Sequence, residues 1–122
     1  MGCPVVEWQM LAKDPEAAVS FYGGLFDWTI DSNNALGYRR VSTGGIGGIN
    51  GGIWPSPPQG HDLVQLFIGV ESVHEYHKRA EQMGAKTIVP PQKLPDGDEL
   101  AIMLDPSGVP FGLVRKSSTT RD

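Results

Sequence analysis

The sequence predicts an α+β domain made of two βαβββ modules. A short strand, a break and an amphipathic helix occur twice in the 122 residues, over 5–26 and again over 64–84. A shift of 58 residues, from Asp14 to Ser72, brings four helix-facing positions of the first copy onto four of the second. The chain also has 16 glycines and 10 prolines, a turn-rich composition that favours many short strands over a helical bundle.

The length and the pattern together predict one domain over residues 1–122. The first module is expected at about 5–54 and the second at about 62–115. A proline-rich connector over 55–61 separates them, and a polar tail follows the second module to residue 122.

The first module begins with a strand followed by a helix. Residues 5–11 alternate between an apolar face and a mixed face that carries Glu7 and Gln9. Asp14 followed by Pro15 marks a helix start, because Asp accepts from the first free amides and proline costs nothing at the first helical position. We expect the helix to end near residue 25 and to bury its apolar side chains. These are Ala18, Val19, Tyr22, Leu25 and Phe26.

The remainder of the first module is expected to contain three strands. Two are short, at 28–31 and 37–42. The third lies in the glycine-rich stretch 44–52, which we interpret as a kinked or bulged strand with close backbone approach. This stretch is not a phosphate loop, because neither dinucleotide-binding spacing nor a Gly-Lys-Ser/Thr ending is present.

The second module repeats this order. Its first strand, 62–69, is expected to turn Val64, Leu66 and Ile68 toward the helix and to leave Gln65 and Phe67 on the other face. Ser72 is expected to cap a helix that ends near Met83, before Gly84. The strands that follow are expected at 86–89, 99–104 and 109–115, with a loop at 90–97 and a tight turn at 105–108.

Composition argues against several classes of partner. The formal net charge of −4 disfavours nucleic acid, whose binders carry basic surfaces. Cys3 is the only cysteine, so no internal disulfide or thiolate zinc site is expected, which fits a reducing cytoplasm. No apolar run approaches the ~20 residues of a membrane helix. We therefore expect a cytoplasmic protein without a membrane segment.

Three segments carry a family resemblance: DPEAAVSFYGGLFDW at 14–28, the stretch 70–86 that ends in MGAK, and DPSGVPFGL at 105–113. With their spacing they cover nearly the whole chain. On these residues the chain resembles the glyoxalase/bleomycin-resistance/dioxygenase superfamily, also called the vicinal oxygen chelate fold. The resemblance implies that two βαβββ modules form a curved, half-open barrel whose concave face encloses a cavity.

The resemblance also implies where a metal would bind. In metal-dependent members, each module supplies one ligand from its first strand and one from its last. Here the first strands offer Glu7 and Gln65, but Gly112 stands where the family has a glutamate. The matching part of 44–52 offers glycines, isoleucines and Asn50. We expect no cofactor and no bound metal; if a divalent ion binds, Glu7 and Gln65 would hold it.

The candidate site residues follow from the same implied cavity. Glu7 is the candidate acid or base, the alternative being a solvated carboxylate at a sheet end. The candidate pocket-lining residues are Gln9, Gln65, Phe67, Asn50, Tyr38 and Trp54. Each has an alternative interpretation. The two glutamines could be exposed to solvent, Asn50 could hydrogen-bond to the backbone of the glycine-rich stretch, and the aromatic residues could form a subunit contact.

Other notable side chains have simpler interpretations. His74 and His77 lie one helical turn apart but flank the apolar stripe, so we assign them to a solvated helix surface. His61 is interpreted as a surface residue at a strand end. Cys3 has no basic neighbour in sequence and is not expected to be a nucleophile. The expected core aromatics are Trp8, Phe21, Tyr22 and Phe26.

Three functions remain open. The first is a small-molecule-binding protein, or a metal-independent enzyme, with a degenerate metal site. The second is a metal-dependent lyase or isomerase of the glyoxalase I type, and the third is a drug-sequestering resistance protein. The resemblance also implies a homodimer, since a second subunit often covers such sheet edges.

Overall fold

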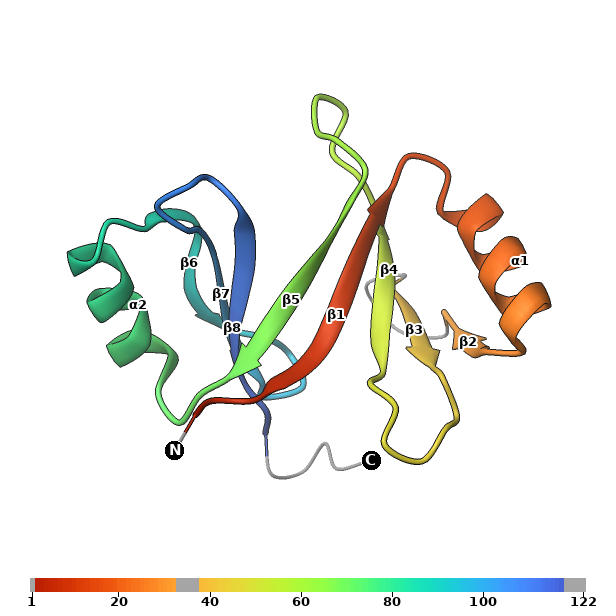
Figure 1. Ribbon diagram of the computed structural model, residues 1–122, viewed down its shortest axis with the longest axis horizontal. Helices are drawn as coiled ribbons and strands as arrows, with labels where there is room; N and C mark the ends of the chain where they lie inside the picture. Colours follow the sequence, from red (N-terminus) through yellow and green to blue (C-terminus); the bar gives the residue numbers. More distant parts are fainter. Residues whose placement is uncertain (1, 33–37, 118–122) are drawn as a thin grey trace. The chain divides into compact units, whose positions relative to one another are not determined.

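The computed structural model describes residues 2–32 and 38–117. Within these residues, strands and helices follow the order predicted for two βαβββ modules (Figure 1). The elements are β1 (Val5–Ala12), α1 (Pro15–Phe26), β2 (Thr29–Asp31), β3 (Arg39–Ser42), β4 (Gly51–Pro55), β5 (Leu63–Gly69), α2 (Val73–Gln82), β6 (Lys86–Lys93), β7 (Glu99–Leu104) and β8 (Pro110–Arg115). The predicted α+β class is confirmed. Of the strand expected at 37–42, Gly37 lies outside the described residues.

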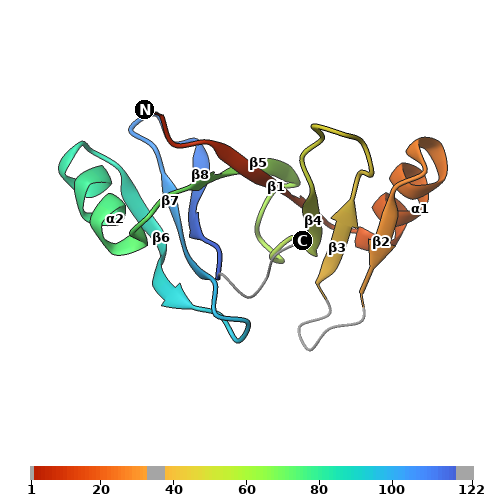
Figure 2. The same ribbon diagram turned by 90° about the horizontal axis from the view of Figure 1, so that it is seen from below.

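The chain divides into two compact units, which we call the N-terminal unit (7–65) and the C-terminal unit (1–6 and 66–122). In the N-terminal unit the strand order is β2-β3-β4-β1. Strand β1 runs parallel to β4, whereas β3 is antiparallel to both of its neighbours. Helix α1 packs on one face of this sheet, against β2 and β4 (Figure 2).

The C-terminal unit repeats the arrangement. Its strand order is β5-β8-β7-β6, with β5 parallel to β8 and the other neighbours antiparallel. Helix α2 packs against β6, β7 and β8 (Figure 1). Between helix and sheet lies a core of five buried side chains. They are Val70, Val73, Ala101, Met103 and Leu113.

Both helices begin where the sequence predicts. The Asp14 carboxylate accepts a hydrogen bond from the Ala17 amide at 3.1 Å, and Ser72 Oγ accepts one from the Glu75 amide at 3.1 Å. Each bond satisfies an amide that has no partner within its own helix. Within the described residues, no helix has both the length and the apolar character needed to cross a membrane.

Two predictions about strands are wrong. Residues 44–50 do not form a strand, and β4 begins only at Gly51, because Gly44 and Gly47 adopt positive φ angles of 82° and 80°. Strand β6 continues through residues 90–93, where we expected a loop. Its pairing with β7 shifts register between Val89 and Gln92, so the two prolines fall at an irregularity of an edge strand, where a missing amide is tolerated.

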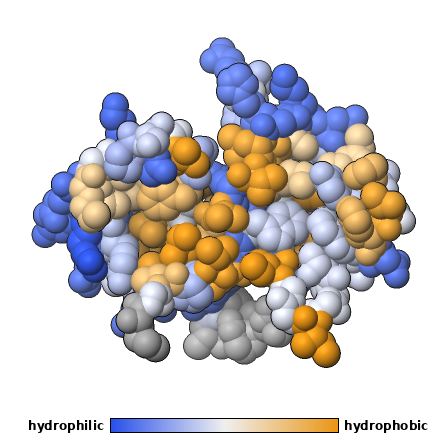
Figure 3. All heavy atoms as spheres, viewed as in Figure 1, coloured by the Kyte–Doolittle hydropathy of each residue, from blue (hydrophilic) through white to orange (hydrophobic). Residues whose placement is uncertain are grey.

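The predicted burial of the first helix is also wrong. None of the residues of α1 is buried, and Phe21, Leu25 and Phe26 are 57%, 61% and 54% exposed. The physical reason is a layer of aromatic rings under the helix: Tyr22 stacks on Trp28 at 5.5 Å, and Trp28 contacts Trp8 at 5.6 Å. Phe26 also contacts this layer, with ring centroids 6.3 Å from Tyr22 and 5.7 Å from Trp28, but more than half of its surface stays exposed, as does that of Phe21 and Leu25. Apolar spheres accordingly gather over this helix at the right of Figure 3.

Strand β5 departs from its prediction in a similar way. Ile68 packs against the core under α2, as expected for the apolar face. Val64 and Leu66, which share its alternation, are 57% and 50% exposed instead. The apolar face of β5 is therefore only partly covered.

Candidate functional site

The N-terminal unit has a polar and aromatic sheet face that points away from α1. Trp8 contacts Trp28 on the helix side, so the alternation of β1 turns Glu7 and Gln9 to the opposite side. Gln9 lies beside Gly52 in the parallel pairing of β1 with β4, and Trp54 follows on the same side of β4. We call this surface, formed by Glu7, Gln9, Tyr38, Gly52 and Trp54, the polar face.

Glu7 and Gln9 contact each other on this face. Gln9 Nε2 donates a hydrogen bond to Glu7 Oε2 at 3.2 Å. Gln9 is buried, with 8% of its surface exposed, and Glu7 is half-buried. The amide of Gln9 therefore helps to position the Glu7 carboxylate.

Tyr38 occupies the position above Gly52. A Cβ atom added to Gly52 would overlap the Tyr38 phenol, so a residue with a side chain does not fit there without displacing the ring. The same ring stacks on Trp54, with centroids 4.5 Å apart and an interplanar angle of 28°. The glycine thus makes room for an aromatic pair next to Glu7.

The surroundings of Tyr38 keep its phenol neutral. Burial raises the pKa of Tyr38 well above its ordinary value, because the charged phenolate loses its hydration. The negative charge of Glu7 raises this pKa further, and the positive charge of Arg40 opposes both effects. Tyr38 therefore carries its proton throughout the physiological pH range.

The C-terminal unit has the same combination of glycine and ring. Gly112 of β8 pairs with Phe67 of β5, and a Cβ atom on Gly112 would overlap the Phe67 ring. Phe67 is fully buried, with 0% exposed. Each unit thus has a glycine in its last strand that is covered by an aromatic ring. In the N-terminal unit this is Gly52, opposite Gln9, and in the C-terminal unit it is Gly112, opposite Phe67.

These contacts decide whether the residues fit the metal implied by the resemblance. Gly112 and Gly52 supply no donor atom, and Phe67 and Tyr38 fill the space that a ligand side chain would need. What remains is the carboxylate of Glu7 and the amide of Gln65, which is 5% exposed. Within residues 2–32 and 38–117, no cluster of three or more His, Cys, Asp or Glu side chains is suited to a metal. This donor set does not fit a divalent ion.

Asn50 contacts the glycine-rich loop. Its Oδ1 accepts hydrogen bonds from the Thr43 amide at 3.0 Å and from Thr43 Oγ1 at 3.3 Å, which closes the loop over residues 43–50. Trp8 Nε1 donates to the Ile49 carbonyl at 2.8 Å and fixes the same segment. Asn50 therefore stabilises the conformation of this loop through hydrogen bonds to Thr43.

The histidines and the cysteine lie elsewhere. His77 Nε2 lies 2.7 Å from Thr87 Oγ1, which in turn donates to Glu81 Oε2 at 2.7 Å. His74 and His61 are exposed. Cys3 is exposed, and its thiol donates to the Tyr76 hydroxyl at 3.5 Å.

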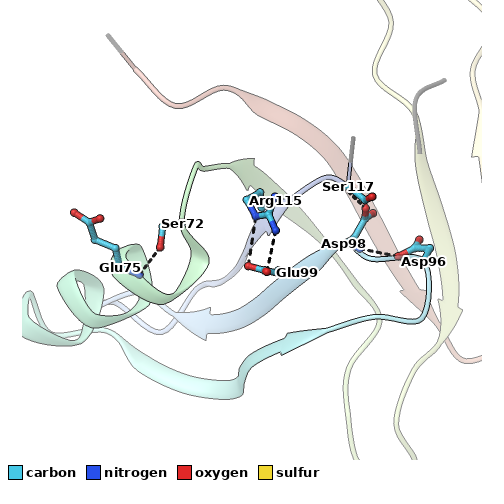
Figure 4. Close-up of polar contacts among 7 residues, drawn as sticks. All are labelled: Ser72, Glu75, Asp96, Asp98, Glu99, Arg115 and Ser117. Atoms are coloured by element: carbon cyan, nitrogen blue, oxygen red, sulfur yellow. Dashed lines mark hydrogen bonds and ion pairs between the residues drawn. The ribbon is translucent and has the colours of Figure 1, made fainter. Parts of the chain in front are cut away.

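The C-terminal unit also contains polar contacts that the sequence pattern did not indicate (Figure 4). Arg115 donates to Glu99 at 2.9 Å across β7 and β8, and this partner lowers the pKa of Glu99. Buried Asp98 accepts a hydrogen bond from the Ser117 amide at 2.6 Å. A charge pair between opposite residues becomes visible only once the strand register is known. The sequence pattern also did not indicate Gly52 and Arg40 of the N-terminal unit, because their positions next to Tyr38 depend on strand register.

Comparison with solved structures shows the same fold. A hypothetical protein from Bacillus halodurans matches with a TM-score of 0.74 and 15% identity, over 100% of both chains. Methylmalonyl-CoA epimerase from Streptomyces coelicolor, in complex with 2-nitronate-propionyl-CoA, matches with 0.64 and 15% identity over 95% of this chain and 96% of that one. The epimerase from Mycobacterium tuberculosis gives 0.64 and 14% identity over 94% and 89%.

Comparison of the sequence itself gives the family. No curated protein matches the chain. A family model described as a glyoxalase-like domain matches residues 6–114, which is most of the sequence. The chain therefore belongs to the family of glyoxalase-like domains, in the glyoxalase/bleomycin-resistance/dioxygenase superfamily.

Proposed function

We propose that this protein binds a small organic molecule on the polar face of its N-terminal unit, and that it does so without a metal ion. The observation that carries the proposal is the Tyr38 ring, which covers Gly52 and stacks on Trp54. An aromatic pair thus takes the place of a metal-ligating side chain.

The aromatic pair gives the ligand a flat apolar surface. Rings bind planar or apolar groups through burial and offset stacking, a contact that needs no charge on the ligand. Because the Tyr38 phenol stays neutral, it adds no negative charge beside Glu7. We therefore expect a ligand with an aromatic or conjugated part.

Glu7 and Gln9 give the ligand its polar contact. A carboxylate held by an amide accepts hydrogen bonds from a hydroxyl or amine group, and the Glu7 carboxylate is the group on this face suited to take up a proton. Binding with one acid or base is compatible with a metal-independent reaction. The class of reaction that suits such a site is proton transfer to or from the bound molecule.

The first experiment addresses the metal. Elemental analysis of the purified protein is expected to find no stoichiometric divalent ion, and a chelator is expected to leave the melting temperature unchanged. Stoichiometric metal together with chelator-sensitive turnover would instead support the alternative, a metal-dependent lyase or isomerase in which Glu7 supplies the acidic ligand.

The second experiment addresses the ligand. A thermal-shift screen of small aromatic and conjugated compounds, with methylmalonyl-CoA included because a structural neighbour binds it, should find stabilising compounds. Trp54→Leu and Glu7→Gln should each lower the apparent affinity for such a compound, measured from the thermal shift, at least tenfold. Trp28→Leu, on the helix side of the same sheet, is the matched control. Equal loss of binding in all three variants, or none in the first two, would contradict the proposed site.

A further inference from the structure

Strand β3 carries two adjacent arginines that point to opposite sides of the sheet. The guanidinium of Arg39 pairs with Glu16 of α1 at 2.6 Å, so Arg39 points to the helix side. Val41, two residues further along the strand, is fully buried. Because successive side chains of a strand alternate, Arg40 points to the other side of the sheet, as Tyr38 does. Arg40 therefore belongs to the polar face.

The strand register places Arg40 next to the aromatic pair. Strands β1, β4 and β3 are neighbours (Figure 2), and Gly52 of β4 lies between Gln9 of β1 and Arg40 of β3. The Tyr38 ring covers this glycine. Burial is the main cause that raises the pKa of Tyr38; the charge of Glu7 raises it further, and that of Arg40 lowers it. A cation on β3 and a carboxylate on β1 therefore act on the same ring.

The two arginines also differ in their partners. Arg39 is half-buried and paired with Glu16, whereas Arg40 is exposed. Within residues 2–32 and 38–117, the Arg40 guanidinium has no hydrogen bond or ion pair. Arginine presents its donors in a planar fork that matches the two oxygens of a carboxylate. An exposed fork beside an aromatic pair suits the acidic group of a flat molecule.

We infer that the ligand of the polar face is a conjugated carboxylic acid, whose carboxylate binds Arg40 and whose flat part packs against Tyr38 and Trp54. This inference rests on the function proposed above and names its ligand class. A hydroxyl group at the far end of the ligand donates to Glu7. Adjacent strands are about 4.8 Å apart, so β1 and β3 are separated by roughly 10 Å. A ring with a short conjugated side chain, as in para-hydroxycinnamate, spans this distance.

The charges of the face favour a carboxylate over a phosphate. Asp31 of β2 lies opposite Arg40 in the register, on the side away from Gly52. Along the four strands of this sheet, the charged side chains that alternate to the polar face are Glu7, Asp31 and Arg40. A phosphate carries a charge of about −1.5 to −2 and would be repelled by both carboxylates. A carboxylate carries one charge and is matched by a single guanidinium.

Calorimetric titration of the full chain at pH 7 tests the inference with two probes, para-hydroxycinnamate and its amide, which has nearly the same shape but no charge. The acid should bind at least tenfold more tightly than the amide, and added salt should weaken only the acid. Arg40→Gln should bring the acid down to the affinity of the amide. Arg39→Gln removes the same charge from the other side of the strand, so as the matched control it should preserve the difference between acid and amide. Circular dichroism spectra should show that both variants are folded.

Asp31→Asn separates ligand binding from a structural role of Arg40. If Arg40 binds the acid, removal of the neighbouring negative charge should strengthen acid binding severalfold and leave the amide unchanged. If Arg40 and Asp31 only shape the sheet surface together, Asp31→Asn should weaken acid binding as much as Arg40→Gln does. That second result would overturn the inference.

Failure of this inference and failure of the proposed function give different results. Equal affinity for acid and amide, with both lost in Trp54→Leu, would overturn the role of Arg40 and leave the site in place. Binding of other conjugated compounds through Trp54, without binding of the acid, would do the same. If no conjugated compound binds, or if Trp54→Leu changes nothing, the proposed function falls and this inference with it.

Discussion

Gly112 illustrates how one residue closes a potential ligand position. The Phe67 ring is fully buried and lies over the Gly112 backbone, in the space that any Cβ atom would occupy. A buried ring has few alternative rotamers in a close-packed core, so it does not move aside easily. A glutamate at position 112 would therefore require the Phe67 ring to move, so the glycine and the ring depend on each other.

We predict that Gly112→Ala destabilises the protein by roughly 1–3 kcal/mol through overpacking. Urea unfolding measures the change. Gly45→Ala is the control, because a Cβ atom there meets nothing within 4 Å and the residue has no positive φ. It should change stability by less than about 0.5 kcal/mol. Equal stability of the Gly112→Ala variant and the wild type would show that Phe67 yields to a side chain.

Tyr38 gives a prediction for alkaline pH. Its folded-state pKa lies above the unfolded value of about 10, so its contribution to stability is fully present below pH 10 and is lost as the pH rises through the folded pKa. Between pH 10 and the folded pKa, the unfolded state has lost the proton and the folded state retains it. Stability therefore falls with rising pH in this range, and Tyr38→Phe should flatten that fall.

Phenolate absorbance near 295 nm measures the same group directly. The wild-type spectrum minus the Tyr38→Phe spectrum should show no phenolate signal up to about pH 10, where an ordinary tyrosine is half ionised. A difference signal that rises with a midpoint near pH 10 would contradict the burial of Tyr38.

Among the elements, strands β7 and β8 are joined at one end by a salt bridge between Glu99 and Arg115, which lie opposite each other (Figure 4). The hydrogen bond from Arg115 is the main cause that lowers the pKa of Glu99. A carboxylate with a lowered pKa contributes stability that is present above its unfolded pKa of about 4.3 and is lost as the pH falls through the folded value.

We predict that Glu99→Gln lowers the melting temperature at pH 7 and reduces the further loss below about pH 4. Thermal unfolding from neutral to acidic pH measures both effects. Because both side chains of the pair remain partly exposed to solvent, the effect should be small and should decrease with added salt. Parallel pH profiles for variant and wild type would mean that the ion pair does not contribute.

Helix α1 shows how an element can be located correctly and its packing mistaken. The Asp-Pro signal and the apolar residues identify the helix, and Pro15–Phe26 confirms it. The apolar residues extend around more of the helix than one stripe, so periodicity alone did not separate the residues that face Trp28 from the exposed residues Phe21 and Leu25. The structure separates them by the stacking of Tyr22 on Trp28.

At the scale of the whole molecule, the two units share strands. Strand β1 contributes residues 5–6 to the C-terminal unit and 7–12 to the N-terminal unit, and β5 is divided between the units after residue 65. Loss of pairing in either strand therefore affects the backbone of both units. Such sharing favours cooperative unfolding.

We predict a single unfolding transition. All three tryptophans, Trp8, Trp28 and Trp54, lie in the N-terminal unit, so their fluorescence reports on that unit. Far-ultraviolet circular dichroism reports on both units. The two signals should give the same midpoint in urea, and separate midpoints would show that the units unfold independently.

The two βαβββ modules, both helix caps, the family and the lack of a carboxylate at position 112 can all be predicted from the sequence. These features depend on local periodicity, capping chemistry and contiguous motifs, which a linear sequence records directly. The three-dimensional packing was needed to learn that Tyr38 covers Gly52, that Phe67 covers Gly112, and that Phe21, Leu25 and Phe26 of α1 are more than half exposed. The physical reason is that each of these contacts depends on the register or packing of segments far apart in the chain, which side-chain alternation within one strand or helix does not specify.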